Sequence, residues 1–212
     1  MTIQEIMKRI KLPEEAQCVV QEQKMTEEDY ERWKVLFQID LKMFLEEWKN
    51  QNQYKEKALY FYLRLSCETY TCYQEQKISD KVFDDTFYDI TIWCEECYRE
   101  YGVYGLKELW WLAQSINMKL FRLGRLQFEP IVIEEDMVGE KEVILKGTRA
   151  LNVHVPAGES LDLKACLDSF RNAEAFFGEK GQIYVCDSWL LAPELKKLLS
   201  EKSNIVRFQN LF

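Results

Sequence analysis

The chain has 212 residues, a formal net charge of −8 and 47% hydrophobic residues, a composition typical of a folded protein with one large domain or two small ones. The negative charge argues against double-stranded nucleic acid as a partner, because phosphate binding depends on clustered lysine and arginine. No run approaches the roughly 18 apolar residues of a membrane span, and the first residues lack a signal-peptide pattern. We therefore expect a cytoplasmic protein with no membrane or nucleic-acid partner.

In the first half of the chain, hydrophobic residues recur at three- and four-residue steps, the pattern of amphipathic helices. The helices predicted from this spacing cover residues 2–11, 13–20, 30–48, 59–72, 83–101 and 106–113. Seven cysteines without a secretory signal favour reduced thiols over a disulfide framework. Cys94 and Cys97 form a C-x-x-C pair, but both lie on an apolar stripe and no second pair stands at metal-ligand spacing. Core packing is therefore favoured over a metal or redox site.

After residue 118 the pattern changes from helical to extended, which predicts a helical domain over 1–118 and an α/β domain over 119–212. The elements predicted in the second domain are strands over 120–128, 131–133, 143–146, 150–155 and 182–186, a helix over 161–177 capped by Ser160, and a short helix from Pro193. The strands on either side of the longer helix form a βαβ unit, so they should lie parallel. The predicted fold class is a two-domain α+β protein, with an all-helical half followed by a mixed-sheet α/β half.

The predicted βαβ unit also indicates where a ligand binds. Ligands on open parallel sheets sit beyond the carboxyl ends of the strands, and the N-terminus of the helix faces the same place. In this chain that edge contains residues 156–160 and 187–190.

The last residues, 204–212, resemble one more strand. A strand in this position would leave an open sheet edge, which is prone to association. We therefore expect either a homodimer completed through this strand or an exposed edge.

Three segments of the second half carry a resemblance to a known family. They are Phe121 to Glu129 (FRLGRLQFE), His154 to Gly158 (HVPAG) and Ser188 to Leu191 (SWLL), followed by Pro193 and by Ser203 to Ile205 (SNI). With these strings the chain resembles bacterial two-domain acyltransferase-domain proteins, which join a helical N-acyltransferase N-terminal domain to a GNAT-like C-terminal domain. The resemblance covers most of the chain. It implies acetyl-CoA or another acyl-CoA as cosubstrate and an amine that attacks the thioester directly.

In the GNAT pattern, a loop between a strand and a helix holds the diphosphate of the coenzyme with its backbone amides. The residues that match this loop are Val155, Pro156, Ala157, Gly158 and Ser160, with Ser188 beyond the next strand. The usual loop has an Arg or Gln and two spaced glycines, whereas this one keeps only Gly158 and adds the carboxylates of Glu159 and Asp162. Because a carboxylate repels a phosphate, this departure favours an alternative, a non-catalytic binding or scaffold protein on a degenerate GNAT fold.

Direct transfer to an amine needs a base. By resemblance, Glu129 is the best-placed carboxylate, and an ion pair with Arg122 or Arg125 is the alternative reading of this residue. His154, the only histidine, is suited to act as a base near neutral pH. Its alternative is a structural hydrogen bond to a neighbouring strand or loop.

The departing thiolate needs a proton donor, and Tyr184 and Cys186 are the candidates on the strand after the helix. A packed tyrosine and a buried cysteine are the alternatives. The chain lacks a nucleotide P-loop, a nucleophile elbow and a zinc-binding helix motif, and we predict no metal site. The prediction is thus an acyl-CoA-dependent N-acyltransferase of unknown acceptor, with the scaffold protein as the alternative.

Overall fold

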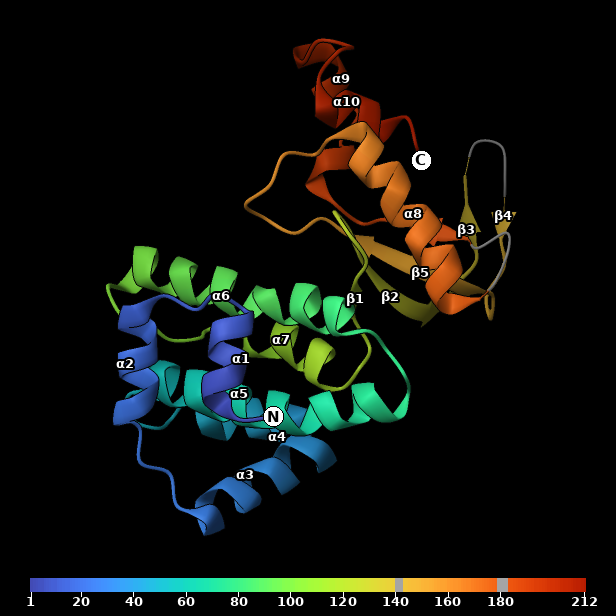
Figure 1. The fold of residues 1–212 in the computed structure, drawn as a ribbon. Coiled ribbons are helices and arrows are strands. Elements are labelled where there is room, and N and C mark those ends of the chain that lie inside the picture. The colour runs from blue at the N-terminus through green and yellow to red at the C-terminus, as the bar shows by residue number, and fades with distance from the viewer. Residues whose placement is uncertain (140–142, 179–182) are drawn as a thin grey trace. The chain divides into compact units, whose positions relative to one another are not determined.

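The computed structural model describes residues 1–139, 143–178 and 183–212 (Figure 1). Gln182, the first residue of a predicted strand, lies outside the described residues. The chain divides into two compact units, Met1–Met118 and Lys119–Phe212.

The first unit, which is described throughout, is built from helices. They are α1 (Ile3–Arg9), α2 (Glu14–Glu22), α3 (Glu27–Ile39), α4 (Leu41–Trp48), α5 (Tyr54–Glu75), α6 (Asp80–Tyr101) and α7 (Leu109–Ile116). The core is rich in aromatic rings, and Phe44, Trp48 and Phe61 are fully buried within it. Cys94 and Cys97 are 0% and 1% exposed on α6. The all-helical first half and the core position of the C-x-x-C pair are therefore confirmed.

The single helix predicted over 30–48 is wrong, because the structure has two helices there. The chain breaks at Asp40, whose backbone has φ −143° and ψ 85° and whose carboxylate accepts a hydrogen bond from the Met43 amide. Aromatic spacing continues across the break, and the rings of Phe37 and Phe44 lie 5.2 Å apart. The apolar pattern therefore records burial of both segments in one core, while the Asp40 cap ends the first helix and starts the second.

The second unit combines a mixed four-stranded sheet with helices, as predicted. Its strands are β1 (Phe121–Arg122), β2 (Gln127–Val132), β3 (Met137–Val138), β4 (Val143–Ile144), β5 (Arg149–His154) and β6 (Tyr184–Val185), and its helices are α8 (Leu163–Phe177), η1 (Trp189–Leu191), α9 (Leu195–Leu198) and α10 (Asn204–Gln209). The sheet order is β1-β2-β5-β6, and β3 pairs with β4 in a separate hairpin. Among the strands of the described residues, only β5 and β6 run parallel, and α8 lies between them in the chain, which confirms the βαβ unit.

The strand predicted over 120–128 is also wrong, because a tight turn divides it into β1 and β2. Gly124 occupies this turn with φ +100°, a conformation that residues with a Cβ rarely adopt. Ser169 of α8 lies directly against it and accepts hydrogen bonds from the amides of Arg125 and Leu126. The turn is therefore held by packing against α8, a contact that local sequence does not reveal.

Replacing Gly124 by alanine should destabilise the protein more than the same change at Gly147. Both glycines have positive φ, but a Cβ at position 124 would lie 2.9 Å from Ser169 Oγ, whereas one at 147 would meet nothing within 4 Å. We expect G147A to cost about 1 kcal/mol of unfolding free energy, and G124A roughly 1–3 kcal/mol more. Urea denaturation of the two variants measures the difference, and equal losses would contradict the role assigned to the Ser169 contact.

The strand predicted over 204–212 is wrong as well. Ser203 accepts a hydrogen bond from the Val206 amide and starts α10, whose Phe208 is fully buried. The Gln209 side-chain amide donates to the carbonyl oxygens of Leu190 and Ala192, which fixes the helix to η1. The described residues thus hold a helix where the homodimer prediction required a sheet edge.

Candidate active site

The sheet of the second unit has one face packed on α8 and one polar face. Phe170 of α8 contacts the rings of Phe128 and Tyr184, which share their face with the buried Leu151. Because side chains alternate along a strand, Glu129 and His154 project from the opposite face. Strand pairing therefore places the two predicted bases on one surface.

Glu129 and His154 contact each other on this polar face. Glu129 Oε2 lies 3.0 Å from His154 Nε2, and each side chain is 22% exposed. The side-chain nitrogen Nδ2 of Asn152 lies 3.4 Å from the same carboxylate oxygen. The alternative partner for Glu129, an ion pair with Arg122 or Arg125, is not what the structure records, since Arg122 pairs with Glu159 and Arg125 donates to backbone carbonyls.

A carboxylate hydrogen-bonded to an imidazole can accept a proton and hold it, which is the task of a general base. The hydrogen bond from His154 on β5 to Glu129 on β2 is also what a purely structural histidine would make. The contact is therefore compatible with both interpretations of His154, the catalytic one and the structural one. Partial exposure leaves the pair accessible to a small molecule on the polar face.

Tyr184 and Cys186, the two predicted proton donors, lie on β6 and directly after it. Tyr184 is on the α8 face, where its hydroxyl is 3.4 Å from the Phe170 carbonyl oxygen, and burial raises the pKa of this phenol. Cys186 follows β6 and is partly buried. Burial, and then the nearby carboxylate of Asp187, raises the pKa of its thiol to about 11. Tyr184 thus lies on the face of the sheet opposite the Glu129–His154 pair, and Cys186 keeps its proton at neutral pH.

Thiol alkylation at pH 8 should follow this order of exposure and pKa. Cys18 and Cys72 are exposed and should react first, whereas Cys186 and Cys94, with pKa values raised mainly by burial to about 11 and about 12, should react only on unfolding. Timed labelling with iodoacetamide and peptide mass spectrometry tests the order of reaction, which rapid labelling of Cys186 would contradict.

The raised thiol pKa values also predict how stability depends on pH. The unfolded chain would lose the protons of Cys186 and Cys94 near the ordinary pKa of 9.0, whereas the folded chain keeps them. The unfolding free energy should therefore fall as the pH rises above 9.

Two nearly buried arginines hold the loop between β5 and α8. Arg125, 6% exposed, donates from Nε to the Ser160 carbonyl oxygen at 2.9 Å and from Nη2 to the Glu159 carbonyl oxygen at 2.8 Å. Arg122, 4% exposed, binds the Glu159 carboxylate at 2.6 Å. The sequence alone shows no partner for the Glu159 carboxylate, whereas in the structure Arg122 neutralises its charge.

The two carbonyl contacts also set the direction of the loop amides. In a trans peptide the N–H points opposite to the C=O, so the N–H groups of Ser160 and Leu161 point away from Arg125. No hydrogen bond to either amide is recorded among the described residues. Gly158, with φ +89° and no atom within 4 Å of the place a Cβ would take, leaves the neighbouring loop open. Consecutive backbone amides can together donate hydrogen bonds to an anion.

Other predicted loop residues have structural partners. Asp162, rather than Ser160, caps α8 by accepting from the Ala165 amide, so the predicted cap was two residues early. Ser160 Oγ instead lies 3.0 Å from Asn204 Nδ2, and Ser188 caps η1 through the Leu190 amide. Val155, Pro156 and Ala157 lead directly from His154 into the open part of the loop. Since both acidic residues are engaged, the loop fits a diphosphate better than its sequence suggests.

A groove lies on the polar face of the sheet. It is on the other side of Glu129 from the loop at Gly158. It encloses about 490 Å³, and its lining includes Ile131, Met137, Asn152, Val185 and Cys186. Volumes of 300–1,000 Å³ are typical of small-molecule sites. Neither Asn152 nor the groove is among the predicted site features, although Asn152 shares the period-2 face of His154.

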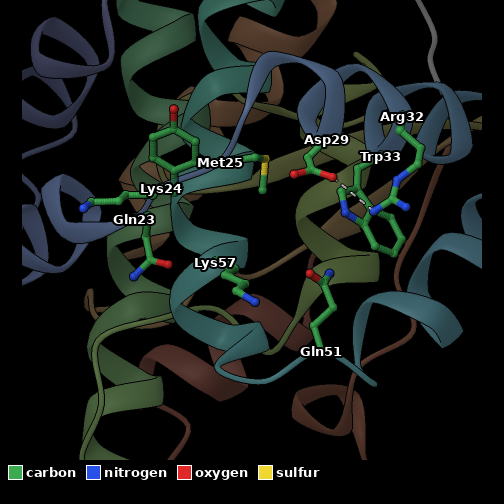
Figure 2. Close-up of a pocket in the computed structure, with 9 residues that line it drawn as sticks. Gln23, Lys24, Met25, Asp29, Arg32, Trp33, Gln51 and Lys57 are labelled. Carbon is green, nitrogen blue, oxygen red and sulfur yellow. Dashed lines mark ion pairs between the residues drawn. The ribbon is translucent and has the colours of Figure 1, made fainter.

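The first unit has a smaller pocket of about 130 Å³ (Figure 2). Its lining includes Trp33, Gln51 and Lys57, together with Arg32, which pairs with Asp29. It contains no carboxylate–histidine pair and lies below the usual volume of a substrate site. This pocket therefore contains neither of the two predicted bases.

The comparisons with known proteins match both units. The model of the N-acyltransferase N-terminal domain matches residues 1–118, and that of the GNAT-like C-terminal domain matches residues 120–212. A search of curated proteins gave no match. Among the described residues, no helix has both the length and the apolar character needed to cross a membrane.

Several solved acyltransferase structures share the fold. One, in complex with decanoyl-CoA and teicoplanin, has a TM-score of 0.76 at 23% identity. Another, in complex with CoA and 10C-teicoplanin, has a TM-score of 0.75 at 24% identity. A third, a mutant in complex with octanoyl-CoA, has a TM-score of 0.76 at 22% identity. Each match covers 98% of this chain and 68% of the other. The chain therefore belongs to the family defined by the N-acyltransferase N-terminal domain, here followed by a GNAT-like C-terminal domain.

Proposed function

We propose that the protein is an acyl-CoA-dependent N-acyltransferase whose reacting centre is the Glu129–His154 pair. The observation that carries this proposal is the 3.0 Å contact between Glu129 and His154 on the strand that leads into the loop at Gly158. Family membership and the likeness to acyltransferases crystallised with CoA and decanoyl-CoA support it.

In the proposed reaction a neutral amine attacks the thioester carbon. The C–N bond forms, the C–S bond breaks, and the products are an amide and free CoA. The Glu129–His154 pair accepts the proton that the amine loses, and this proton passes to the thiolate of the departing CoA. Partial burial of the pair strengthens its interaction with the charge that develops on nitrogen.

The loop at Gly158 would hold the diphosphate of the coenzyme. The amides of Ser160 and Leu161 are oriented away from Arg125 and can donate to phosphate oxygens, and the Arg122–Glu159 pair removes the repulsion that the free carboxylate would cause. The pantetheine arm would then run back along β5 from His154 toward Asn152.

A non-catalytic scaffold is the alternative to this function. It was favoured by the acidic helix start, but Asp162 is used as a helix cap and Glu159 as an ion-pair partner. The observed contacts therefore favour the enzyme.

We also propose a cytoplasmic location and a small-molecule amine as acceptor. All seven cysteines are free, which fits a reducing compartment. Teicoplanin, present in structures of related acyltransferases, is the starting point for an acceptor screen.

Calorimetric titration tests the proposed function. We expect saturable binding of CoA and of desulfo-CoA by the full chain, and much weaker binding of a nucleoside diphosphate control, which has the diphosphate but lacks the pantetheine arm. Absence of heat with either coenzyme form at millimolar concentration would favour the scaffold.

A further inference from the structure

We propose that the pocket of the first unit binds a compact dianion, either free phosphate or the phosphate group of a small molecule. This inference is independent of the proposed function, because every lining residue lies within Met1–Met118, whereas the reacting pair and the coenzyme loop belong to the second unit. The pocket encloses about 130 Å³. It therefore has room for a phosphate-sized group and a few waters, since each water takes about 30 Å³ of the liquid.

Three separate segments of the chain bring positive charges to this pocket. Lys24 precedes α3, Arg32 lies on α3 and Lys57 lies on α5. The one carboxylate of the lining, Asp29, contacts Arg32 at 3.4 Å and the Thr26 hydroxyl at 2.8 Å. For the side chains of Lys24 and Lys57, no ion pair or hydrogen bond is recorded among the described residues. Three cations and one carboxylate leave two net positive charges here, in a chain whose net charge is −8.

A buried hydrogen-bond donor indicates what the pocket holds. Gln51 follows α4, and its side-chain nitrogen Nε2 is buried without a hydrogen-bond partner in the described part of the chain. Figure 2 shows the Gln51 and Lys57 side chains extending into the pocket. A buried donor without a partner costs free energy, and lysine, arginine and glutamine side chains are common donors to phosphate oxygens. A phosphate in the pocket would accept from Gln51 and neutralise Lys57 at the same time.

Charge and size together select the ligand. A phosphate monoester carries about −1.5 to −2 charges at pH 7, which matches the two net positive charges of the lining, whereas a monocarboxylate brings only one. Met25, Trp33 and Tyr60 form the rest of the wall and suit the short carbon skeleton of a small phosphate ester. The nucleotide of a coenzyme is too large for a pocket of about 130 Å³. We therefore expect small phosphates to bind more tightly than acetate, and desulfo-CoA not to enter.

The test is an NMR titration of the full chain at constant ionic strength with inorganic phosphate, glycerol 3-phosphate, acetate and desulfo-CoA. The signals followed are the Gln51 side-chain amide and the Trp33 indole N–H, because the loop of the second unit is itself proposed to bind phosphates and only a local signal separates the two places. We expect saturable shifts with both phosphates, at least about tenfold weaker binding of acetate, and no shift with desulfo-CoA. Tighter binding of glycerol 3-phosphate than of phosphate would identify an ester as the ligand, and the reverse order would identify the free anion.

Two variants remove one donor each. Lys57→Gln and Gln51→Met, followed through the Trp33 signal, should each weaken phosphate binding about 10- to 100-fold, the usual effect of losing a charge-assisted hydrogen bond. Lys42→Gln, the same change as K57Q at an exposed position of α4 outside the lining, is the matched control and should bind phosphate like the wild type. Because Gln51 Nε2 has no recorded partner among the described residues, Q51M should keep or raise the unfolding free energy in phosphate-free buffer. A purely structural glutamine would instead lose stability on this change.

Three results would overturn the inference. Gln51 and Trp33 signals that stay in place at millimolar phosphate would mean that the pocket holds only water. Phosphate affinity that survives both K57Q and Q51M would place the anion elsewhere. A shift of the same signals with desulfo-CoA would assign the pocket to the coenzyme. None of these measurements involves the Glu129–His154 pair, so the failure of this inference and the failure of the proposed function are distinguishable.

Discussion

Replacing Glu129 by glutamine should lower kcat for amide formation about 10²- to 10⁴-fold, the usual contribution of a general base. Glutamine keeps the shape of the side chain and can still bond to His154, but it cannot accept the proton of the amine. Because the side chain is 22% exposed, we expect the unfolding free energy to change by less than about 1 kcal/mol. Single-turnover rates and urea denaturation of the same preparation measure the two quantities.

Asp168→Asn is the matched control for this variant. Asp168 is a 48% exposed carboxylate of α8 that pairs with Arg171, so its amide should keep full activity. An E129Q enzyme with unchanged kcat, or one that loses stability in proportion to activity, would assign Glu129 to structure.

Replacing Arg125 by lysine should weaken CoA binding about 10- to 100-fold without affecting pantetheine, which lacks the diphosphate. Lysine keeps the charge but cannot donate in a fork to the carbonyls of Glu159 and Ser160. The two peptides would be free to rotate, and their amides would no longer point together toward the diphosphate. Loss of one charge-assisted hydrogen bond should also cost about 2 kcal/mol of unfolding free energy.

Two further variants separate this positioning role from general destabilisation. Arg171→Lys, at a 72% exposed position, should bind CoA like the wild type. Glu159→Gln, at a 54% exposed position, should bind CoA more tightly, because it removes a negative charge from the loop. If R125K weakens CoA and pantetheine equally, or if E159Q weakens CoA binding, the loop does not hold the diphosphate.

The sequence predicted the βαβ unit well because each of its parts has a local signal. Alternation marks β5, three- and four-residue spacing marks α8, and Gly178 ends the helix in the left-handed conformation, with φ +71°. The same alternation placed His154 on the face opposite Leu151 and Val153. That face is the one that the structure brings against Glu129.

The contacts between segments had no such signal. The Glu129–His154 pair depends on the register of β2 against β5, which follows from a turn at Gly124 held by Ser169. Arg122 was a plausible partner for Glu129 in the sequence, but the turn directs it to Glu159 instead. These pairings depend on contacts between segments that are far apart in the sequence, so the spacing of apolar residues could not predict them.

Two of the three misassigned segments of the fold share a cause. Residues 30–48 keep an apolar spacing across the cap at Asp40, and residues 204–212 are too short for period 2 and period 3.6 to be distinguished. In both places a capping side chain, Asp40 or Ser203, decides the outcome. A capping side chain can therefore end or start a helix within a continuous apolar pattern.

The most direct test of the account is an amide NMR titration of the full chain with desulfo-CoA, because it places the coenzyme on individual residues. We expect saturable shifts of the Ser160 and Leu161 backbone amides, of the Asn152 side-chain amide and of the His154 ring, with the core of the first unit unchanged. Binding that leaves the amides of 158–161 unperturbed would contradict the account, since the coenzyme would then lie somewhere other than the loop that Arg125 orients.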